Sequence, residues 1–392
     1  MARAAAAELG ISQATLYAYV SRGLIRSEPL EEGGRGRRYR AEDVRNLKTR
    51  RAPLVQGEGL KAADLPVLDT AVSTITEDGP VYRGVLATAL AGTATFEQVA
   101  TLLWDARTTD PFAKNNLPHV SSAMRLILDA TDRAPPIERA IAVLSLAADA
   151  DPSAFNATPE GRAITGAKIL RLVTAAMLRT QPKALPIHEQ IAQAWALAHP
   201  RAGDLIRHAL VLLADHELNP STFTVRCAAS TGLSLYDAVI AGLVALKGPR
   251  HGGVGPQASR LLETLLAGDA AAIVRERVAL GERFAGFGHA IYGERDPRAL
   301  SMFEALIKAG NIDERMTVEI PHLIDKATGQ FPNCDYALAV MRRALNMPVG
   351  CETTIFAMAR LAGWIAHASE QLDSKKLIRP RARYVGPPPV KL

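Results

Sequence analysis

Apolar residues recur at three- and four-residue spacing along most of the chain, as they do in α-helices that bury one face. The clearest segments are TFEQVATLLWDA, ERAIAVLSLAADA, AITGAKILRLVTAAML, LIRHALVLLADHEL and PRALSMFEALIKAG. Glycine and proline separate these segments, and the Val, Ile and Thr alternation of strands is nearly absent. The pattern predicts an all-α body up to about residue 370, followed by an extended tail, RPRARYVGPPPVKL.

The first 51 residues have a different texture. A short alanine-rich helix is expected to end at Gly10, and a second helix to run from Gln13 to about Arg22 with Leu16, Tyr19 and Val20 facing inward. The glycine-broken basic stretch SEPLEEGGRGRRYR then predicts a hairpin or wing, and a third helix follows in AEDVRNLKTRR. Residues 52–66 read as a glycine-containing linker.

Charge supports a separate N-terminal module. Residues 1–51 contain 11 Lys and Arg against 6 Asp and Glu, a net +5 out of +6 for the whole chain. The module resembles a MerR-type winged helix-turn-helix, in which the second helix enters the DNA major groove. The resemblance implies contacts with bases or phosphates from Gln13, Thr15, Tyr17 and Arg22, and with the DNA backbone from Arg37 and Arg38. A docking module that keeps the fold without an operator is the alternative.

Composition limits the remaining possibilities. The chain has 392 residues, 48% of them hydrophobic, so it can bury large cores. No apolar stretch reaches the roughly 18–20 residues of a membrane span, and the start MARAAAAELG lacks the bulky apolar run of a secretory signal. Cys227, Cys334 and Cys351 lack metal-ligand spacing. We therefore expect a cytoplasmic protein with no metal site and no membrane contact.

Four ionisable residues lie where the backbone leaves or enters a helix. His216 ends the apolar run of LLADHELNPST, and His251 lies in the glycine-rich turn of LKGPRHGGVGP. His289 follows the glycines of GFGHAIY, and Asp335 precedes the apolar helix of FPNCDYALAV. Each of them alone is typical of a structural residue or a helix cap. Together they predict one site, because the chain places them at positions that a ligand can approach closely.

The stretch GFGHAIYGERDPR has two interpretations. In the first, Asp296 caps a helix, Pro297 takes its first position and Arg298 faces solvent. In the second, the stretch forms an anion site, because glycines expose backbone and helix N-termini favour negative charge.

Arg360 is the lone Lys, Arg, Asp or Glu in TIFAMARLAGWIAHA, residues 354–368. A helix that is apolar on all sides is normally buried, and a buried guanidinium needs an anionic partner. That partner is either an internal carboxylate or a substrate. Together with Arg298 and Arg379, Arg360 supplies enough guanidinium groups to bind a small dicarboxylate bidentately.

These motifs together resemble the citrate synthase family, in particular its bacterial citrate and 2-methylcitrate synthases. The resemblance runs from about Leu68 to Gly386 and is almost continuous over ADHELNPSTFTVRCAASTGLSLYDAVIAGLVALKGPRHGG. It implies a two-domain helical homodimer. Residues 67–251 and 343–392 would form the large domain, and residues 252–342 a small mobile domain.

The family resemblance also implies a reaction. An acyl-CoA, either acetyl-CoA or propionyl-CoA, condenses with oxaloacetate, and the thioester is then hydrolysed to give citrate or 2-methylcitrate and CoA, with no permanently bound cofactor. Asp335 would act as the base, His251 would bind the thioester oxygen and His289 would polarise the keto group. The implied substrate-binding residues are His216, Arg298, Arg360 and the Arg379 of the other subunit, and the implied coenzyme contacts are Gly286, Phe287, Gly288 and Arg295.

Two alternatives stay open at the level of sequence. Acetyl and propionyl groups differ by one methylene, which an apolar pocket distinguishes by only about 1–3 kcal/mol. The chain could also be a DNA-binding regulator that uses a synthase-like body as a metabolite sensor. A pure sensor would need the binding groups but not the base, so the presence of Asp335 favours catalysis.

Overall fold

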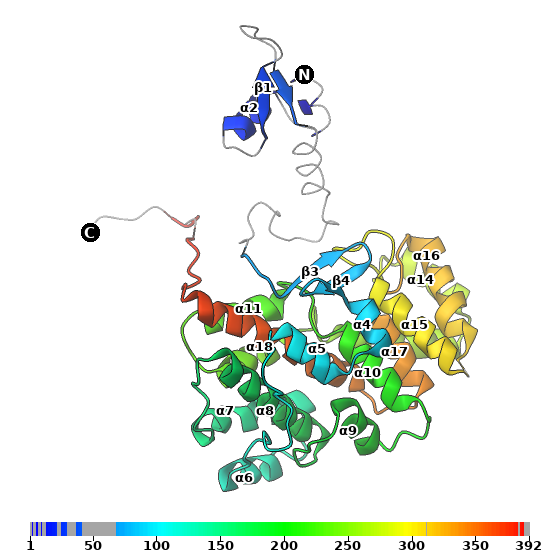
Figure 1. Ribbon diagram of the computed structural model, residues 1–392. Helices are drawn as coiled ribbons and strands as arrows, with labels where there is room; N and C mark the ends of the chain where they lie inside the picture. Colours follow the sequence, from blue (N-terminus) through cyan, green and yellow to red (C-terminus); the bar gives the residue numbers. More distant parts are fainter. Residues whose placement is uncertain are drawn as a thin grey trace. The chain divides into compact units, whose positions relative to one another are not determined.

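Helices make up most of the described chain (Figure 1). The computed structural model describes residues 2, 5–6, 9, 13–21, 25–29, 37–40, 68–310, 312–382 and 385–387. Its contacts divide the chain into two units, Met1–Leu68 and Asp69–Leu392, each with a hydrophobic core of its own.

The N-terminal unit contains helix α2 (Gln13–Ser21) and the antiparallel strands β1 (Ser27–Pro29) and β2 (Arg37–Tyr39). Leu16 is fully buried, and Tyr19 and Val20 pack against the same small core, as the sequence predicts. The predicted helix and hairpin are therefore confirmed. The segment AEDVRNLKTRR lies outside the described residues.

The predicted DNA contacts are only partly within the described region. Gln13 and Tyr17 are exposed on α2, with Tyr17 at 52% exposure, and Thr15 is partly buried. Arg22 lies outside the described residues, and of Arg37 and Arg38 only the backbone, in β2, is described. The contacts of all six residues stay a prediction.

The second unit opens with a small antiparallel sheet of β3 (Ser73–Thr76), β4 (Gly79–Tyr82) and β5 (Val85–Leu86). Helices then follow one another to the end of the body. They are α4 (Ala87–Thr93), α5 (Phe96–Leu103), α6 (Ser122–Ala130), α7 (Pro136–Ala150), α8 (Pro159–Leu178), α9 (Ile187–Ala194), α10 (Ala202–Leu212), α11 (Pro220–Ala229), α12 (Leu235–Leu246), α13 (Val254–Ala267), α14 (Ala270–Ala279), α15 (Pro297–Ala309), the π-helical turn η2 (Arg315–Glu319), α16 (Ile320–Thr328), α17 (Cys334–Ala344) and α18 (Cys351–Ser374). The all-α prediction is confirmed for the body, with this sheet as an addition.

Polar caps fix the starts of the helices that border the candidate site. Asn219 caps α11 and is followed by Pro220 in the first helical turn. Asp296 caps α15 in the same way and is followed by Pro297 in the first helical turn. The Asn333 side chain accepts the backbone N–H of Asp335 and so caps α17. These side chains satisfy N–H groups that no helical carbonyl reaches, so they also fix the loops that enter the helices.

Helix α18 is the central element of the second unit. It packs against α5, α8, α10, α11, α12, α13 and α17. All fifteen residues from Thr354 to Ala368 are buried, as expected of a helix that is apolar on every side. At Gly363 the helix touches the loop after α10, because Gly363 donates its backbone N–H to the Ala214 carbonyl at 3.0 Å.

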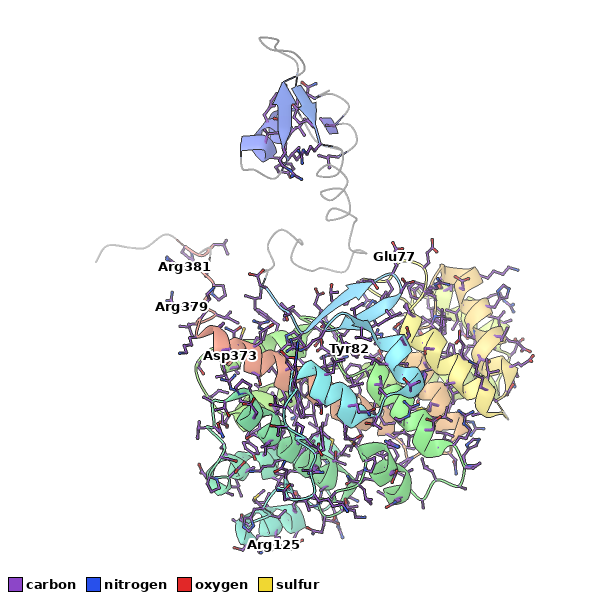
Figure 2. All side chains as sticks on the ribbon, viewed as in Figure 1. Glu77, Tyr82, Arg125, Asp373, Arg379 and Arg381 are labelled. Carbon is purple, nitrogen blue, oxygen red and sulfur yellow. The ribbon has the colours of Figure 1, made fainter. Side chains whose placement is uncertain are left out.

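Helices α13 to α17 also pack on one another, and α15 contacts α4 and α10 as well. The division into a large domain and a small domain at residues 252 and 342 stays a prediction. Beyond α18 the described residues are exposed apart from the half-buried Ile378, and Figure 2 shows Arg379 and Arg381 on this C-terminal segment. Within the described residues, no helix is both long and apolar enough to cross a membrane.

The close approach at Gly363 generates a stability prediction. A Cβ atom there would lie 2.1 Å from Asp215 Oδ1 and 2.7 Å from the Ala214 carbonyl oxygen. Gly363→Ala should therefore lower the free energy of unfolding by about 1–3 kcal/mol through overpacking, measured as a lower Tm by circular dichroism. Gly92→Ala on α4 is the matched control, since nothing lies within 4 Å of a Cβ atom at Gly92. Equal Tm values for the two variants would contradict the predicted close contact.

Candidate active site

The first part of the site is a cluster of His216, His289, Tyr292 and Arg298. The ring centroids of His216 and His289 lie 5.3 Å apart. Tyr292 packs against both rings, with centroid distances of 5.7 and 4.7 Å, and the Arg298 guanidinium carbon lies 5.5 Å from the Tyr292 centroid. The loop before α15 and the loop after α10 therefore bring two of the predicted histidines and one predicted arginine together.

Hydrogen-bond donors face both ring nitrogens of His289. Its Nδ1 lies 3.1 Å from the backbone N of Ile291 and 3.3 Å from that of Tyr292. Its Nε2 lies 3.3 Å from Arg298 Nη2, which can only donate. Burial, and then the charge of Arg298, lower the pKa of His289 to about 4, so the ring is neutral at pH 7. A neutral imidazole has one accepting nitrogen, so it accepts either the backbone pair or Arg298 and donates from the other nitrogen.

Arg298 is buried, with 2% exposure, and pairs with Asp296. It donates from Nε to Asp296 Oδ1 at 3.0 Å and from Nη2 to Asp296 Oδ2 at 2.8 Å. The same carboxylate accepts the backbone N–H of Cys334 at 3.1 Å, which links α15 to α17. The cap at Asp296 and the Pro297 position are confirmed, but the interpretation in which Arg298 faces solvent is wrong.

Arg360 on α18 is 1% exposed and has no salt bridge to a described carboxylate. Its Nε donates to the Leu213 carbonyl at 3.0 Å, and its guanidinium carbon lies 4.7 Å from the Phe356 ring centroid. Among the described residues its two Nη atoms have no hydrogen-bond partner. Burial lowers the pKa of Arg360, although the negative charge of Asp215 opposes this shift. A directly paired internal carboxylate is therefore not found, and the Nη groups can bind an external anion.

His251 lies in the turn before α13 and belongs to a series of hydrogen-bonded side chains. Its Nε2 is 2.8 Å from Ser221 Oγ, which also accepts the Trp364 Nε1–H at 3.2 Å. The Phe356 ring, which carries Arg360 on its face, lies 5.9 Å from the His251 ring. Burial, and then the charge of Arg360, lower the pKa of His251 to about 4, so this ring is also neutral at pH 7.

Asp335 is the second residue of α17, and Asn333, not Asp335, provides the cap. The Asp335 carboxylate has no hydrogen-bond partner among the described residues. Desolvation raises the pKa of Asp335 to about 6, against the opposing charge of Arg298. The Asp335 carboxylate can therefore accept a proton near neutral pH.

The predicted coenzyme contacts at residues 286–288 already use much of their backbone internally. Gly288 donates its N–H to the Phe331 carbonyl, and Asn333 donates its backbone N–H to the Gly286 carbonyl, both at 2.8 Å. Asn333 Nδ2 also donates to the Gly288 carbonyl at 2.9 Å. At Gly286, with φ of +85°, a Cβ atom would lie 2.8 Å from Tyr336 Cβ. Packing therefore explains the glycines without a coenzyme, and contact with the coenzyme stays a prediction.

Phe287, Arg295 and Arg379 are not joined to the cluster described above. Phe287 is buried and packs on Tyr336 with a ring distance of 4.7 Å. Arg295 is exposed in a cavity of about 420 Å³ whose lining includes the acidic residues Glu77, Asp78 and Glu304. That surrounding does not favour phosphate. Arg379 is exposed in the C-terminal segment, and its entry into a second subunit stays a prediction.

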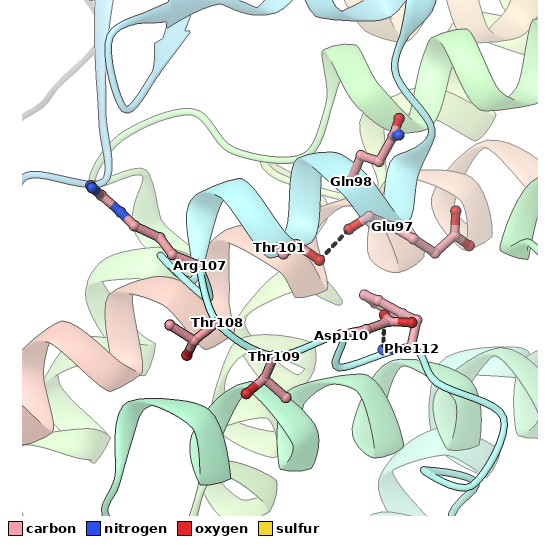
Figure 3. Close-up of a pocket in the computed structure, with 8 residues that line it drawn as sticks. All are labelled: Glu97, Gln98, Thr101, Arg107, Thr108, Thr109, Asp110 and Phe112. Atoms are coloured by element: carbon pink, nitrogen blue, oxygen red, sulfur yellow. Dashed lines mark hydrogen bonds between the residues drawn. The ribbon is translucent and has the colours of Figure 1, made fainter.

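Another cavity, of about 490 Å³, contains none of the predicted site residues (Figure 3). It lies between α5 and the loop that follows it, and its lining consists of Glu97, Gln98, Thr101, Arg107, Thr108, Thr109, Asp110 and Phe112. No group of three or more His, Cys, Asp or Glu side chains with metal-ligand geometry occurs in the described part of the chain.

Sequence reasoning missed three residues that contact the predicted ones, namely Ser221, Tyr292 and Asp296 as an ion-pair partner, whereas helical spacing does place Phe356 on the same face as Arg360. Tyr292 and Asp296 lie inside the stretch GFGHAIYGERDPR, so their nearness to His289 and Arg298 was a usable signal. The contact between Ser221 and His251 joins residues 30 positions apart, and no local pattern indicates it.

Comparisons with known proteins identify the family of both parts of the chain. Residues 59–381 match the citrate synthase C-terminal domain family, and residues 1–64 match the MerR HTH family of regulatory proteins. Citrate synthase 2 of Bacillus subtilis is 30% identical over 347 residues, which cover 81% of this chain and 93% of that protein. The 2-methylcitrate synthase of Mycobacterium tuberculosis is 29% identical over 378 residues, which cover 88% and 96% of the two chains.

Solved citrate synthase structures share the fold. The enzyme from Pyrobaculum aerophilum has a TM-score of 0.70 and 25% identity, covering 84% of this chain and 92% of its own. The ternary complex of Thermoplasma acidophilum citrate synthase with carboxymethyl coenzyme A and oxaloacetate has a TM-score of 0.67 and 23% identity, covering 84% and 96%. The chain thus belongs to the citrate synthase family and is an acyltransferase of the citrate and 2-methylcitrate synthase type.

Proposed function

We propose that the chain condenses an acyl-CoA with oxaloacetate and then hydrolyses the thioester, releasing CoA and citrate or 2-methylcitrate. The observation that carries this proposal is the combination of Asp335, whose pKa is raised to about 6, with neutral histidines and two buried guanidinium groups. Family membership supports the same reaction. Each step below is assigned to residues of this chain.

The keto acid would bind to the buried hydrogen-bond donors of the site. Arg360 offers two Nη groups that have no partner among the described residues, and Arg298 Nη2 and His289 Nε2 lie 3.3 Å apart in the proposed site. Oxaloacetate has two carboxylates and one keto oxygen, which are acceptors of the kind these groups require. His289 would donate to the keto oxygen, leaving the keto carbon electrophilic.

Enolisation would begin at Asp335. An unperturbed aspartate, with a pKa of about 3.9, is a weak base for a carbon acid. The raised pKa of Asp335 makes its carboxylate a stronger base that is still mostly ionised at pH 7. The carboxylate would take a proton from the carbon next to the thioester. His251 would donate its ring N–H to the thioester oxygen. A donor on Nδ1 requires the Ser221 hydroxyl, which lies 2.7 Å from Asn219 Oδ1 and 2.8 Å from His251 Nε2, to turn its single proton from Asn219 to His251 when the acyl-CoA binds.

Carbon–carbon bond formation would follow from the enol. Its carbon attacks the keto carbon of oxaloacetate, and the keto oxygen takes up a proton as it becomes a hydroxyl group. Water then attacks the thioester carbonyl, and the CoA thiol leaves. Closure of the proposed small domain, residues 252–342, would exclude water until the new bond has formed.

Three further assignments belong to the proposal. A second copy of the chain would bring Arg379 to the substrate carboxylates and so complete the site. The acyl group is acetyl or propionyl, as in the relatives with both names. All three cysteines are free thiols, which supports the expected cytoplasmic location.

A regulatory role is the second candidate function. The basic N-terminal module, its match to the MerR family and the exposed positions of Gln13 and Tyr17 on α2 favour DNA binding by residues 1–51. In that case the body would sense oxaloacetate or acyl-CoA for the module. The unpaired, partly desolvated Asp335 favours turnover over sensing alone, because a sensor has no use for a base.

Replacing the base tests the proposed reaction. Asp335→Asn removes the proton acceptor while keeping the size of the side chain, so thiol release should fall by about 10²–10⁴-fold. The assay uses acetyl-CoA and propionyl-CoA in turn with oxaloacetate, and calorimetry should show that oxaloacetate binding is retained. Asp129→Asn on the exposed face of α6 is the control, with expected wild-type rates. Equal turnover in Asp335→Asn and wild type would remove Asp335 from the mechanism.

The raised pKa of Asp335 predicts a pH profile. The carboxylate is the active form, so kcat/KM should rise with pH and level off above about 6, falling about tenfold per pH unit on the acid side. His251 and His289 are already neutral there, because the pKa of each is near 4. Initial rates between pH 5 and 8, taken in buffers of one ionic strength, provide the measurement. A flat profile over this range would argue against a desolvated Asp335.

Salt dependence tests the second candidate function. If residues 1–51 bind DNA, fluorescence anisotropy with a labelled duplex should show affinity that falls linearly, on a log–log scale, between roughly 50 and 200 mM salt. Arg37→Ala together with Arg38→Ala should lower the slope by about 1–2, since each phosphate contact contributes about one. A chain lacking residues 1–66 serves as the control. Binding that ignores salt, or that survives this deletion, would defeat the DNA-binding role.

A further inference from the structure

Tyr292 contacts three residues to which the family resemblance assigns oxaloacetate, namely His216, His289 and Arg298. Its backbone N–H donates to His289 Nδ1 at 3.3 Å, and its hydroxyl lies 3.1 Å from His216 Nε2. Its ring faces the Arg298 guanidinium at 5.5 Å. The side chain is 5% exposed, so these contacts form in an enclosed position and not at the surface.

The direction of the hydrogen bond between Tyr292 and His216 follows from the protonation of both groups. Burial, and then the charges of Arg298 and Arg360, hold the pKa of His216 well below its usual range, so the ring is neutral and has one N–H. Burial raises the pKa of Tyr292, so the phenol keeps its proton. The phenol O–H is the more acidic donor and the imidazole nitrogen the more basic acceptor, so Tyr292 donates to His216 Nε2. The N–H of His216 is then on Nδ1.

The contacts of His289 differ from those of His216. Its Nδ1 faces the backbone N–H groups of Ile291 and Tyr292, and its Nε2 faces Arg298 Nη2, so donors approach this ring from both sides. The Tyr292 hydroxyl therefore selects the tautomer of His216 alone.

We propose that Tyr292 is a positioning residue for oxaloacetate: its hydroxyl donates to His216 Nε2 and so fixes that ring with its donor N–H on Nδ1. The inference rests on the proposed function and deepens it, because it concerns how the same site recognises the keto acid. Neither the sequence motifs nor the proposed steps assign a role to this hydroxyl. Without it, His216 could place its proton on either nitrogen, and part of the population would present a lone pair to the substrate carboxylate.

Tyr292→Phe isolates the hydroxyl, because the ring and the backbone N–H remain. Calorimetric titration of the full-length variant with oxaloacetate should show binding about 3- to 10-fold weaker than wild type, the loss expected for one neutral hydrogen bond. The same substitution in a His216→Ala background should change the affinity by less than about twofold, since the hydroxyl acts through His216. The KM for acyl-CoA should stay unchanged in Tyr292→Phe.

Nitrogen chemical shifts give a readout that a purely structural role would not move. With 15N-labelled histidine, Tyr292→Phe should shift the His216 tautomer from Nδ1–H toward Nε2–H and leave the His289 nitrogen shifts unchanged. Tyr236→Phe is the matched control, because its buried hydroxyl donates to Asp151 Oδ2 at 2.8 Å and contacts no predicted site residue. This variant should bind oxaloacetate as wild type does.

The outcomes separate this inference from the proposed function. If wild type binds oxaloacetate but Tyr292→Phe binds it equally well, the inference fails and the proposed function stands. If the loss in Tyr292→Phe is undiminished in the His216→Ala background, the hydroxyl acts without His216 and the inference is again overturned. If wild type neither binds oxaloacetate nor turns it over, both fail together.

Discussion

The burial of the Arg360 guanidinium in α18 is the constraint on which the candidate site depends. Burying a positive charge in a helix that is apolar on all sides costs free energy unless an anion binds to it. The described residues provide a carbonyl oxygen from Leu213, the face of Phe356 and the more distant charge of Asp215, but none of them forms a direct ion pair with Arg360. The same charge disfavours a second cation nearby, which contributes to the neutral state of the site histidines.

The two buried arginines satisfy this constraint differently. Arg298 has its own carboxylate in Asp296, two residues away, and so occupies one geometry before any ligand arrives. Arg360 keeps its Nη groups unpaired, so it retains the capacity to bind charge. Arg298 is therefore held in place before a ligand binds, whereas Arg360 keeps a positive charge that favours binding of an anion. Together the two side chains suit a ligand that carries negative charge at more than one point.

Much of this could be predicted from the sequence, and the limits have physical causes. Periodicity placed the helices, and the Asn219-Pro220 and Asp296-Pro297 pairs placed two starts, because caps are local interactions. The burial of α18 followed from its lack of a polar face. The pairing of Ser221 with His251 and the unpaired state of Arg360 depend on tertiary contacts, which no spacing encodes. The sequence did not predict the small sheet, because strands of two to four residues are too short to show an alternation of apolar and polar residues.

Asn333 has a mechanical consequence. Its side-chain amide and backbone N–H donate to the Gly288 and Gly286 carbonyls just before His289, while its side-chain oxygen accepts the backbone N–H of Asp335 in the first turn of α17. These hydrogen bonds tie the segment before His289 to the start of the helix that carries Asp335. A conformational change that keeps them intact would move His289 and Asp335 together, so it would alter their distance to Arg360 more than their distance to each other.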